Sequence, residues 1–211
     1  MKNKKSEEKD QCLIFLPSLG GGGAEKVFAE LFNFLNSKNY NVKLVLAKKK
    51  GENLARIKNK SNLIDFDSNK ISRSIPKLLF YLLKTKPKIA VSGMTHTNLC
   101  LIISCLVYKF ISGKNIRIII SERAPTNFLY PNNKSFYNKL IRILIRILYN
   151  FSEKIITVSD GIKYDLENYY GIKKDKIFTI RNPVNIDHQI FNNNLVKPYY
   201  WYEDSIPVGI S

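Results

Sequence analysis

The sequence predicts an α/β fold: a doubly wound, parallel Rossmann-like sheet with helices on both faces. Seven short runs of apolar, β-forming residues recur along the chain, and helical patterns lie between most of them. Because each run is continuously apolar, both faces of its strand should be covered, as in a parallel sheet. The predicted strands cover residues 12–16, 42–46, 63–66, 89–92, 116–121, 154–158 and 176–180. The predicted helices cover residues 24–36, 75–84, 97–111, 135–150 and 160–169.

The first predicted strand leads into a glycine-rich turn and the start of a helix. The amides of Gly21, Gly22 and Gly23, together with the positive end of the helix dipole, would form a site for a phosphate or pyrophosphate. Ala24 and Glu25 follow where a P-loop has Gly-Lys-Ser/Thr, and the spacing also fails the dinucleotide fingerprint. A tight turn in which Glu25 only complements the dipole is an equally good interpretation.

Polar residues follow the predicted strands at the points where these strands end. Parallel sheets bind ligands outside the carboxyl ends of their strands. The glycine turn, residues 92–96 with His96, residues 121–123 with Glu122 and Arg123, and residues 159–161 with Ser159 should therefore face one rim.

The chain is strongly basic. Its 211 residues carry a formal net charge of +17, and residues 38–60 hold eight lysines and arginines against one glutamate. Such a surface attracts nucleic acid, anionic lipid or phosphorylated ligands, and charge alone does not choose among them. Solvated lysines of a lysine-rich proteome explain the same charge.

Cysteine usage and the apolar runs indicate the compartment. Cys12, Cys100 and Cys105 lie in apolar segments without the spacing of metal ligands, which is typical of core residues in a reducing compartment. Residues 1–10 mix both charge signs, unlike a signal peptide, and the apolar run 99–108 is too short to span a bilayer. We expect a cytoplasmic protein.

The sequence divides into three parts. Residues 1–10 form a charged extension, residues 11–187 the α/β domain, and residues 188–211 a linker followed by one new strand. That strand has no partner sequence, so we expect the first strand of a missing C-terminal domain. A gene fragment, a frameshifted product and half of a split enzyme all fit this pattern.

Four motifs in this order resemble the N-terminal domain of family 4 retaining glycosyltransferases, which have the two-domain GT-B architecture. They are residues 20–25 (Gly-Gly-Gly-Gly-Ala-Glu), 121–123 (Ser-Glu-Arg), 156–161 (Ile-Thr-Val-Ser-Asp-Gly) and 180–187 (Ile-Arg-Asn-Pro-Val-Asn-Ile-Asp). The resemblance implies transfer of a sugar from a nucleotide-sugar, with UDP as the expected nucleotide, to a hydroxyl acceptor. It implies no cofactor and no metal. The acceptor is expected to be a lipid-linked glycan of bacterial surface polysaccharide, lipopolysaccharide or glycoconjugate synthesis.

The resemblance also assigns roles to residues. Gly21, Gly22, Gly23 and Glu25 would lie at the donor phosphates, and His96 would be the catalytic residue near the reacting sugar. The acceptor side would be lined by Glu122, Arg123 and Ser159. Each has a plainer alternative: His96 capping a helix, Glu122 and Arg123 forming a local ion pair, and Ser159 acting as an N-cap.

The helix predicted at 135–150 is apolar apart from one basic stripe. Lys139, Arg142 and Arg146 are spaced i, i+3, i+7 and so share one face. This pattern is typical of a helix that docks on an anionic membrane. Such docking would place the protein peripherally on the inner face of the cytoplasmic membrane. The same pattern is also typical of a deeply packed helix whose cations reach the surface.

Two other functions remain open from the sequence. A non-catalytic basic α/β module would bind a phosphorylated ligand or nucleic acid, although no motif for specific nucleic-acid recognition is visible. A non-functional fragment is the other. In such transferases most donor recognition belongs to the C-terminal domain, so we expect residues 1–211 to be inactive alone, with a separately encoded C-terminal half as a candidate partner.

Overall fold

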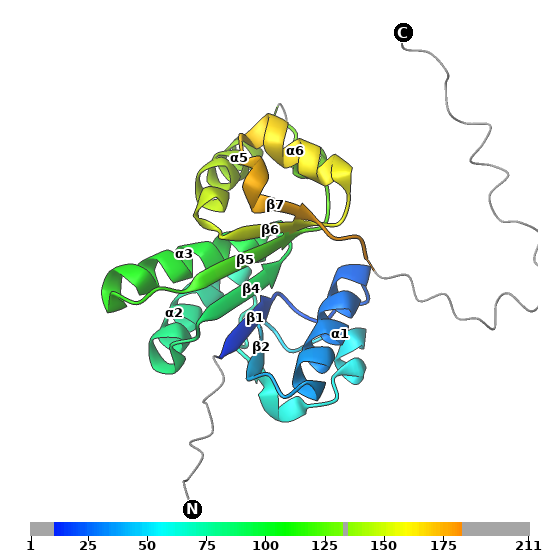
Figure 1. Cartoon of the computed structure of the whole chain (residues 1–211), viewed down its shortest axis with the longest axis vertical. Helices are drawn as coiled ribbons and strands as arrows, with labels where there is room; N and C mark the ends of the chain where they lie inside the picture. Colours follow the sequence, from blue (N-terminus) through cyan, green and yellow to red (C-terminus); the bar gives the residue numbers. More distant parts are fainter. Residues whose placement is uncertain (1–10, 133–134, 183–211) are drawn as a thin grey trace, which may run out of the picture.

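The computed structural model describes residues 11–132 and 135–182, which form one seven-stranded, fully parallel sheet in the order β3-β2-β1-β4-β5-β6-β7 (Figure 1). The predicted fold class is therefore confirmed. The strands are β1 Cys12–Leu16, β2 Val42–Leu46, β3 Leu63–Asp65, β4 Ile89–Gly93, β5 Arg117–Glu122, β6 Lys154–Thr157 and β7 Ile177–Thr179.

The helices connect successive strands. They are α1 Gly23–Ser37, α2 Ser74–Thr85, α3 Thr95–Ser112, α4 Thr126–Leu129, α5 Phe136–Leu148 and α6 Asp160–Tyr170. Short 3-10 turns are η1 Glu52–Arg56, η2 Lys60–Asn62, η3 Ile71–Arg73, η4 Tyr149–Phe151 and η5 Lys174–Lys176. The short helix α4 and these turns were not predicted from the sequence.

Helices cover both faces of the sheet because successive strand residues point to opposite sides. On β1, Ile14 and Leu16 belong to the core under α1, which includes Phe28 and Phe32. Their neighbours on the strand face a second, larger core, built with residues of α2, α3, α5 and α6. Alternation within continuous apolar strands thus produces the two helical layers.

Helix α3 is long and apolar enough to cross a membrane by length and composition, although 56% of it is buried inside the fold. The helix predicted at 97–111 is confirmed, beginning two residues earlier and ending one residue later than predicted. It contacts α2, α5 and the strands β4 and β5. These contacts are those of a core helix in an α/β domain.

The carboxyl ends of β1, β4, β5 and β6 lie next to one another, because these four strands are neighbours in the sheet. The four polar groups predicted to share a rim therefore do share one. The predicted boundary at residue 187, the linker and the final strand at 188–211, and the extension at 1–10 lie outside the described residues.

Candidate functional site

The glycine turn is held by the segment that follows β2. The Asn53 side-chain amide donates to the carbonyls of Gly20 and Gly22, and the Leu19 amide donates to the Lys50 carbonyl at 2.9 Å. Gly51 makes this approach possible: its φ is +115°, and a Cβ there would lie 2.0 Å from the Leu19 carbonyl oxygen. The sequence analysis did not identify Asn53 and Gly51 as site residues. They follow the strand predicted at 42–46, so their position in the chain already places them at the same rim.

Two carboxylates lie against the glycine turn. A Cβ on Gly22 would come within 2.5 Å of Glu25 Oε2, and one on Gly21 within 3.0 Å of Glu52 Oε2. Glu25 thus folds back over the turn from the first turn of α1, whose N-cap is Gly22. Both carboxylates are on flexible side chains, and an anion at the turn would displace them. The donor-phosphate role of Gly21, Gly22, Gly23 and Glu25 stays a prediction.

Arg123 lies over the same corner of the rim. Its guanidinium carbon is 5.0 Å from the centre of the Phe28 ring, and its Nη1 donates to Asn182 Oδ1 at 2.7 Å. Partial burial lowers the pKa of Arg123, and the nearby charge of Glu25 opposes that shift. The Arg123 Nε is buried and has no hydrogen-bond partner among the described residues. Because this Nε is covered, any contact of Arg123 with a ligand would come from its Nη atoms.

The Phe28 ring is itself fixed by a glycine. A Cβ on Gly93, the last residue of β4, would lie 2.2 Å from Phe28 Cε2. The ring packs directly on the strand end, with Arg123 of the neighbouring strand above it. This stack joins α1, β4 and β5 at the rim.

Glu122 does not line the rim, which corrects the expectation from the sequence. Its side chain is 1% exposed and accepts hydrogen bonds from the Thr95 hydroxyl at 3.1 Å, the Tyr149 hydroxyl at 2.5 Å and the Arg123 backbone amide at 3.3 Å. Burial raises the pKa of Glu122 to about 7, although these hydrogen bonds lower it in part. No ion pair joins its carboxyl to the Arg123 guanidinium. Glu122 thus lies beneath the rim and joins the end of β5 to the start of α3 and to Tyr149.

His96 lies in the first turn of α3, exposed at the rim. Its Nε2 and the Tyr137 hydroxyl are 2.6 Å apart, and its Nδ1 and the Tyr130 hydroxyl are 3.1 Å apart. Partial loss of water around the ring lowers the pKa of His96 below its usual 6.5. A neutral imidazole, with one donating and one accepting nitrogen, fits two hydroxyl partners. Both ring nitrogens thus already have partners, and the catalytic role of His96 stays a prediction.

Ser159 caps a helix. Its Oγ accepts a hydrogen bond from the Ile162 amide at 3.3 Å, at the N-terminus of α6. The plainer interpretation of Ser159 is therefore satisfied by the structure, while it still lies on the rim after β6. Its acceptor-side role stays a prediction.

The three cations of α5 do not form one free stripe. Lys139 and Arg146 are exposed, but Arg142 turns toward α4 and α6 and donates to Asn127 Oδ1, the Tyr130 carbonyl and the Tyr170 hydroxyl. This corrects the expectation that all three cations are freely exposed, since Arg142 is anchored to neighbouring elements. The membrane-facing role of Lys139, Arg142 and Arg146 stays a prediction. The sequence spacing indicated the common face but not the neighbouring elements against which it packs.

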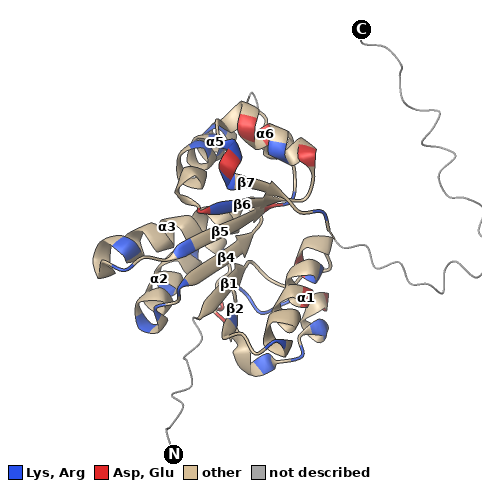
Figure 2. Cartoon of the chain, in the orientation of Figure 1, with Lys and Arg blue, Asp and Glu red and all other residues tan. Residues whose placement is uncertain are grey.

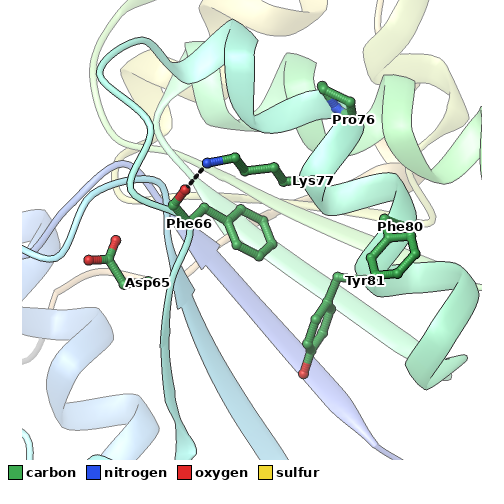
Figure 3. Close-up of a pocket in the computed structure, with 6 residues that line it drawn as sticks. All are labelled: Asp65, Phe66, Pro76, Lys77, Phe80 and Tyr81. Atoms are coloured by element: carbon green, nitrogen blue, oxygen red, sulfur yellow. Dashed lines mark hydrogen bonds between the residues drawn. The ribbon is translucent and has the colours of Figure 1, made fainter.

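Two cavities lie away from the glycine turn. One of about 530 Å³ lies beside the edge strand β3 and is lined by residues of its end and of α2, where the Lys77 ammonium donates to the Phe66 carbonyl (Figure 3). The other, of about 280 Å³, lies between α5 and α6. Neither is lined by His96 or Arg123. Within the described part of the chain, no group of three or more His, Cys, Asp or Glu side chains is placed to hold a metal ion.

Solved structures share the fold. An apo lipopolysaccharide outer core galactosyltransferase, WaaB, is 18% identical with a TM-score of 0.62, covering 84% of this chain and 47% of its own. Alr3699/HepE of Anabaena in complex with UDP is 13% identical with a TM-score of 0.56, covering 82% and 44%. A putative UDP-N-acetylglucosamine 2-epimerase of Listeria monocytogenes is 14% identical with a TM-score of 0.54, covering 81% and 44%.

The chain spans about half the length of these structures. A galactosyltransferase and a protein described as a putative epimerase share the fold, so the fold alone does not decide the reaction. No curated protein matches the chain. The family does follow from the sequence: the model of Glycosyltransferase Family 4 matches residues 21–188, most of the chain. The chain therefore belongs to glycosyltransferase family 4, with the Rossmann-like N-terminal domain of the GT-B architecture.

Proposed function

We propose that this domain supplies the acceptor side of a retaining glycosyltransferase. The reaction transfers a sugar from a UDP-linked donor to a hydroxyl of a lipid-linked glycan in bacterial surface polysaccharide synthesis. The observation that supports the proposal is the strand order, which puts the glycine turn, His96 and Arg123 after the neighbouring strands β1, β4 and β5 in a chain of this family. The lipopolysaccharide galactosyltransferase among the matched structures supports the choice of acceptor class.

The rim offers positive groups where the leaving diphosphate would develop charge. Backbone amides of the glycine turn and the guanidinium of Arg123 would stabilise that charge. Arg123 is partly desolvated on Phe28, which strengthens its interaction with an anion. The diphosphate would replace the Glu25 and Glu52 carboxylates at the turn, and Arg123, which no ion pair holds to Glu25, would contact it.

His96 would contact the donor sugar as a neutral hydrogen-bonding group. The lowered pKa of its ring keeps the imidazole uncharged near pH 7. Both ring nitrogens are engaged by Tyr130 and Tyr137, so one of these contacts opens when a substrate hydroxyl takes its place. The Tyr137 contact is the natural one to open, because Tyr137 is more exposed than Tyr130.

A second Rossmann domain would complete the donor site. The matched structures are about twice as long as this chain, and we assign the nucleotide contacts to the additional domain, on the same or a separate polypeptide. Calorimetric titration with UDP and UDP-sugars, with and without the polypeptide encoded directly downstream, tests this. Binding and transfer with that polypeptide support the proposal, and absence of both in every combination contradicts it.

The role of His96 has its own test in the assembled enzyme. His96→Ala is expected to lower sugar transfer at least about a hundredfold, as typical of a lost catalytic contact. The melting temperature should change little, because the side chain is at the surface. Lys84→Ala is the control away from the site: this exposed residue lies in the last turn of α2, which leads into the start of β4, so it is far from the rim and its loss should change neither activity nor melting temperature much. Parallel loss of activity and melting temperature in His96→Ala would rule out the catalytic role.

A further inference from the structure

The cavity between α5 and α6 is lined by three cations. Lys139, Arg142 and Arg146 come from α5, and two tyrosines of α6 form the opposite wall; the full lining is Asn132, Lys139, Arg142, Ile143, Arg146, Tyr169 and Tyr170. The volume of about 280 Å³ accommodates a phosphate-bearing group. None of the three cations is in an ion pair with a residue of 11–132 or 135–182. Three cations around one cavity favour an anionic occupant.

Arg142 forms a fixed floor for such an anion. Its Nη1 donates to Asn127, Tyr130 and Tyr170, and its guanidinium carbon is 5.1 Å from the centre of the Tyr170 ring. These contacts order the guanidinium before any ligand binds, so little side-chain freedom is lost on binding. A planar guanidinium also suits phosphate oxygens better than an ammonium does. Lys139 and Arg146, both exposed, flank this floor.

A second stripe on α5 is apolar and exposed. Its four residues are spaced i, i+4, i+7, i+11, so they share one helix face: Phe136 (83% exposed), Leu140 (43%), Ile143 (53%) and Ile147 (53%). The buried residues Ile141 and Ile145 form a different face, which packs on the core. An apolar stripe directly beside a cationic one is the pattern of helices that lie in a membrane interface.

We propose that α5 docks on an anionic membrane, with its apolar stripe among the acyl chains and a lipid phosphate in the α5–α6 cavity. The helix lies on the outside of the domain, where Figure 1 shows α5 and α6 together at one end of the molecule. In Figure 2 positive segments are spread over both helical layers, so net charge alone does not select this surface. The apolar stripe next to three cations is what distinguishes this surface from the rest of the molecule.

Docking there would place the candidate site at the membrane. Tyr137, in the first turn of α5, contacts His96 at 2.6 Å. This consequence rests on the proposed function, because it assumes a lipid-linked acceptor. The docking itself stands on other residues and is tested without any sugar substrate.

Sedimentation with vesicles tests the docking of the full chain. Binding is expected with phosphatidylcholine vesicles that contain phosphatidylglycerol and not with phosphatidylcholine alone. Replacing Lys139 and Arg146 together by Gln should weaken binding roughly 30-fold, from two cations near an anionic surface. Ile143→Ser with Ile147→Ser should weaken it at least about tenfold through lost apolar burial.

A matched control removes two exposed cations elsewhere on the chain. Lys58→Gln with Lys60→Gln lowers the net charge equally within the most basic segment of the chain. Because these lysines do not line the cavity, their loss should change binding about threefold at most. Thermal unfolding of each variant checks that the fold is kept; little change is expected, because all six substituted residues are exposed.

Several results would overturn the proposal. They are equal recovery with neutral and anionic vesicles, an equal effect of the control pair, and an unchanged affinity of the Lys139/Arg146 variant.

Calorimetry with inorganic phosphate separates the sources of the anion. Phosphate binding that depends on Lys139 and Arg146, without vesicle binding, would assign the cavity to a soluble phosphorylated ligand. Vesicle binding without sugar transfer in the assembled enzyme would refute the proposed function and leave the docking intact.

Discussion

Glu122 should give the domain a pH-dependent stability of unusual sign. Burial raises its folded-state pKa to about 7 from an ordinary value of 4.5. The folded protein thus prefers the protonated carboxyl, so the contribution of Glu122 to stability is largest below pH 4.5. It declines as the pH rises to about 7 and is constant above. The difference between the two pKa values corresponds to roughly 3 kcal/mol of unfolding free energy.

Glu122→Gln removes this titration while keeping the shape of the side chain. The amide carbonyl still accepts from Thr95, and the amide nitrogen donates to the Tyr149 hydroxyl when that hydroxyl rotates. Any change in these hydrogen bonds is the same at every pH and cancels in the comparison. Relative to wild type, the variant should therefore gain roughly 3 kcal/mol of stability between pH 4.5 and pH 8.

Urea unfolding, followed by circular dichroism across this pH range, measures the difference. Parallel stability profiles of wild type and Glu122→Gln would show that the carboxyl ionises without penalty and would refute the reasoning. Glu153→Gln is the control with the opposite sign. Glu153 is exposed, and the hydrogen bond from Arg117 at 2.8 Å lowers its pKa, so its small contribution is present at neutral pH and lost in acid.

Three further changes test separate contacts. Gly51→Ala should lower the unfolding free energy by about 2–4 kcal/mol in urea melts, because a Cβ would meet the Leu19 carbonyl at 2.0 Å and the φ of +115° is strained for alanine. Arg142→Gln should destabilise by about 1–3 kcal/mol in the same assay, through lost hydrogen bonds to Asn127 and Tyr170; an unchanged midpoint would contradict its inward packing. The His96 imidazole should titrate below 6.5 in NMR spectra, with its signal assigned by loss in His96→Ala; titration above 6.5 would contradict its partial burial.

The sequence predicts the elements of the sheet well and the short connections poorly. The bounds of β1 and β2 match the predicted runs, because continuous apolar residues mark a doubly covered strand. Helix α4 has only four residues and no periodic pattern. It depends instead on Asp165, which accepts from the Thr126 hydroxyl at 2.7 Å and the Asn127 amide at 2.9 Å across 38 or more residues of sequence. Contacts at such separation leave no local signal.

The candidate site shows the same division. Topology brings residues at strand ends to one rim, so the positions of His96 and Arg123 follow from the strand pattern. Side-chain direction does not follow: Glu122 and Arg123 are adjacent, and one points inward and the other outward. The inward position belongs to Glu122 because Thr95 and Tyr149, both 27 residues away, supply its hydrogen bonds. Pairing across that separation is visible only in the folded chain.

The segment from α5 through η4 connects the proposed membrane surface to the candidate site at two points. Its first turn places Tyr137 on His96, and its end places Tyr149 on the buried Glu122, which also holds Thr95 at the start of α3. His96 directly follows Thr95, so both ends of the segment act on the same helix start. A shift of α5 on docking would therefore reach His96 along two routes. The exposed contact to Tyr137 is the weaker constraint, because a surface hydroxyl exchanges readily with water, whereas the buried Glu122 contact keeps the rim in place. For the membrane-borne acceptor that we propose, this arrangement would let His96 exchange Tyr137 for a substrate hydroxyl while the buried Glu122 contact holds the strand end.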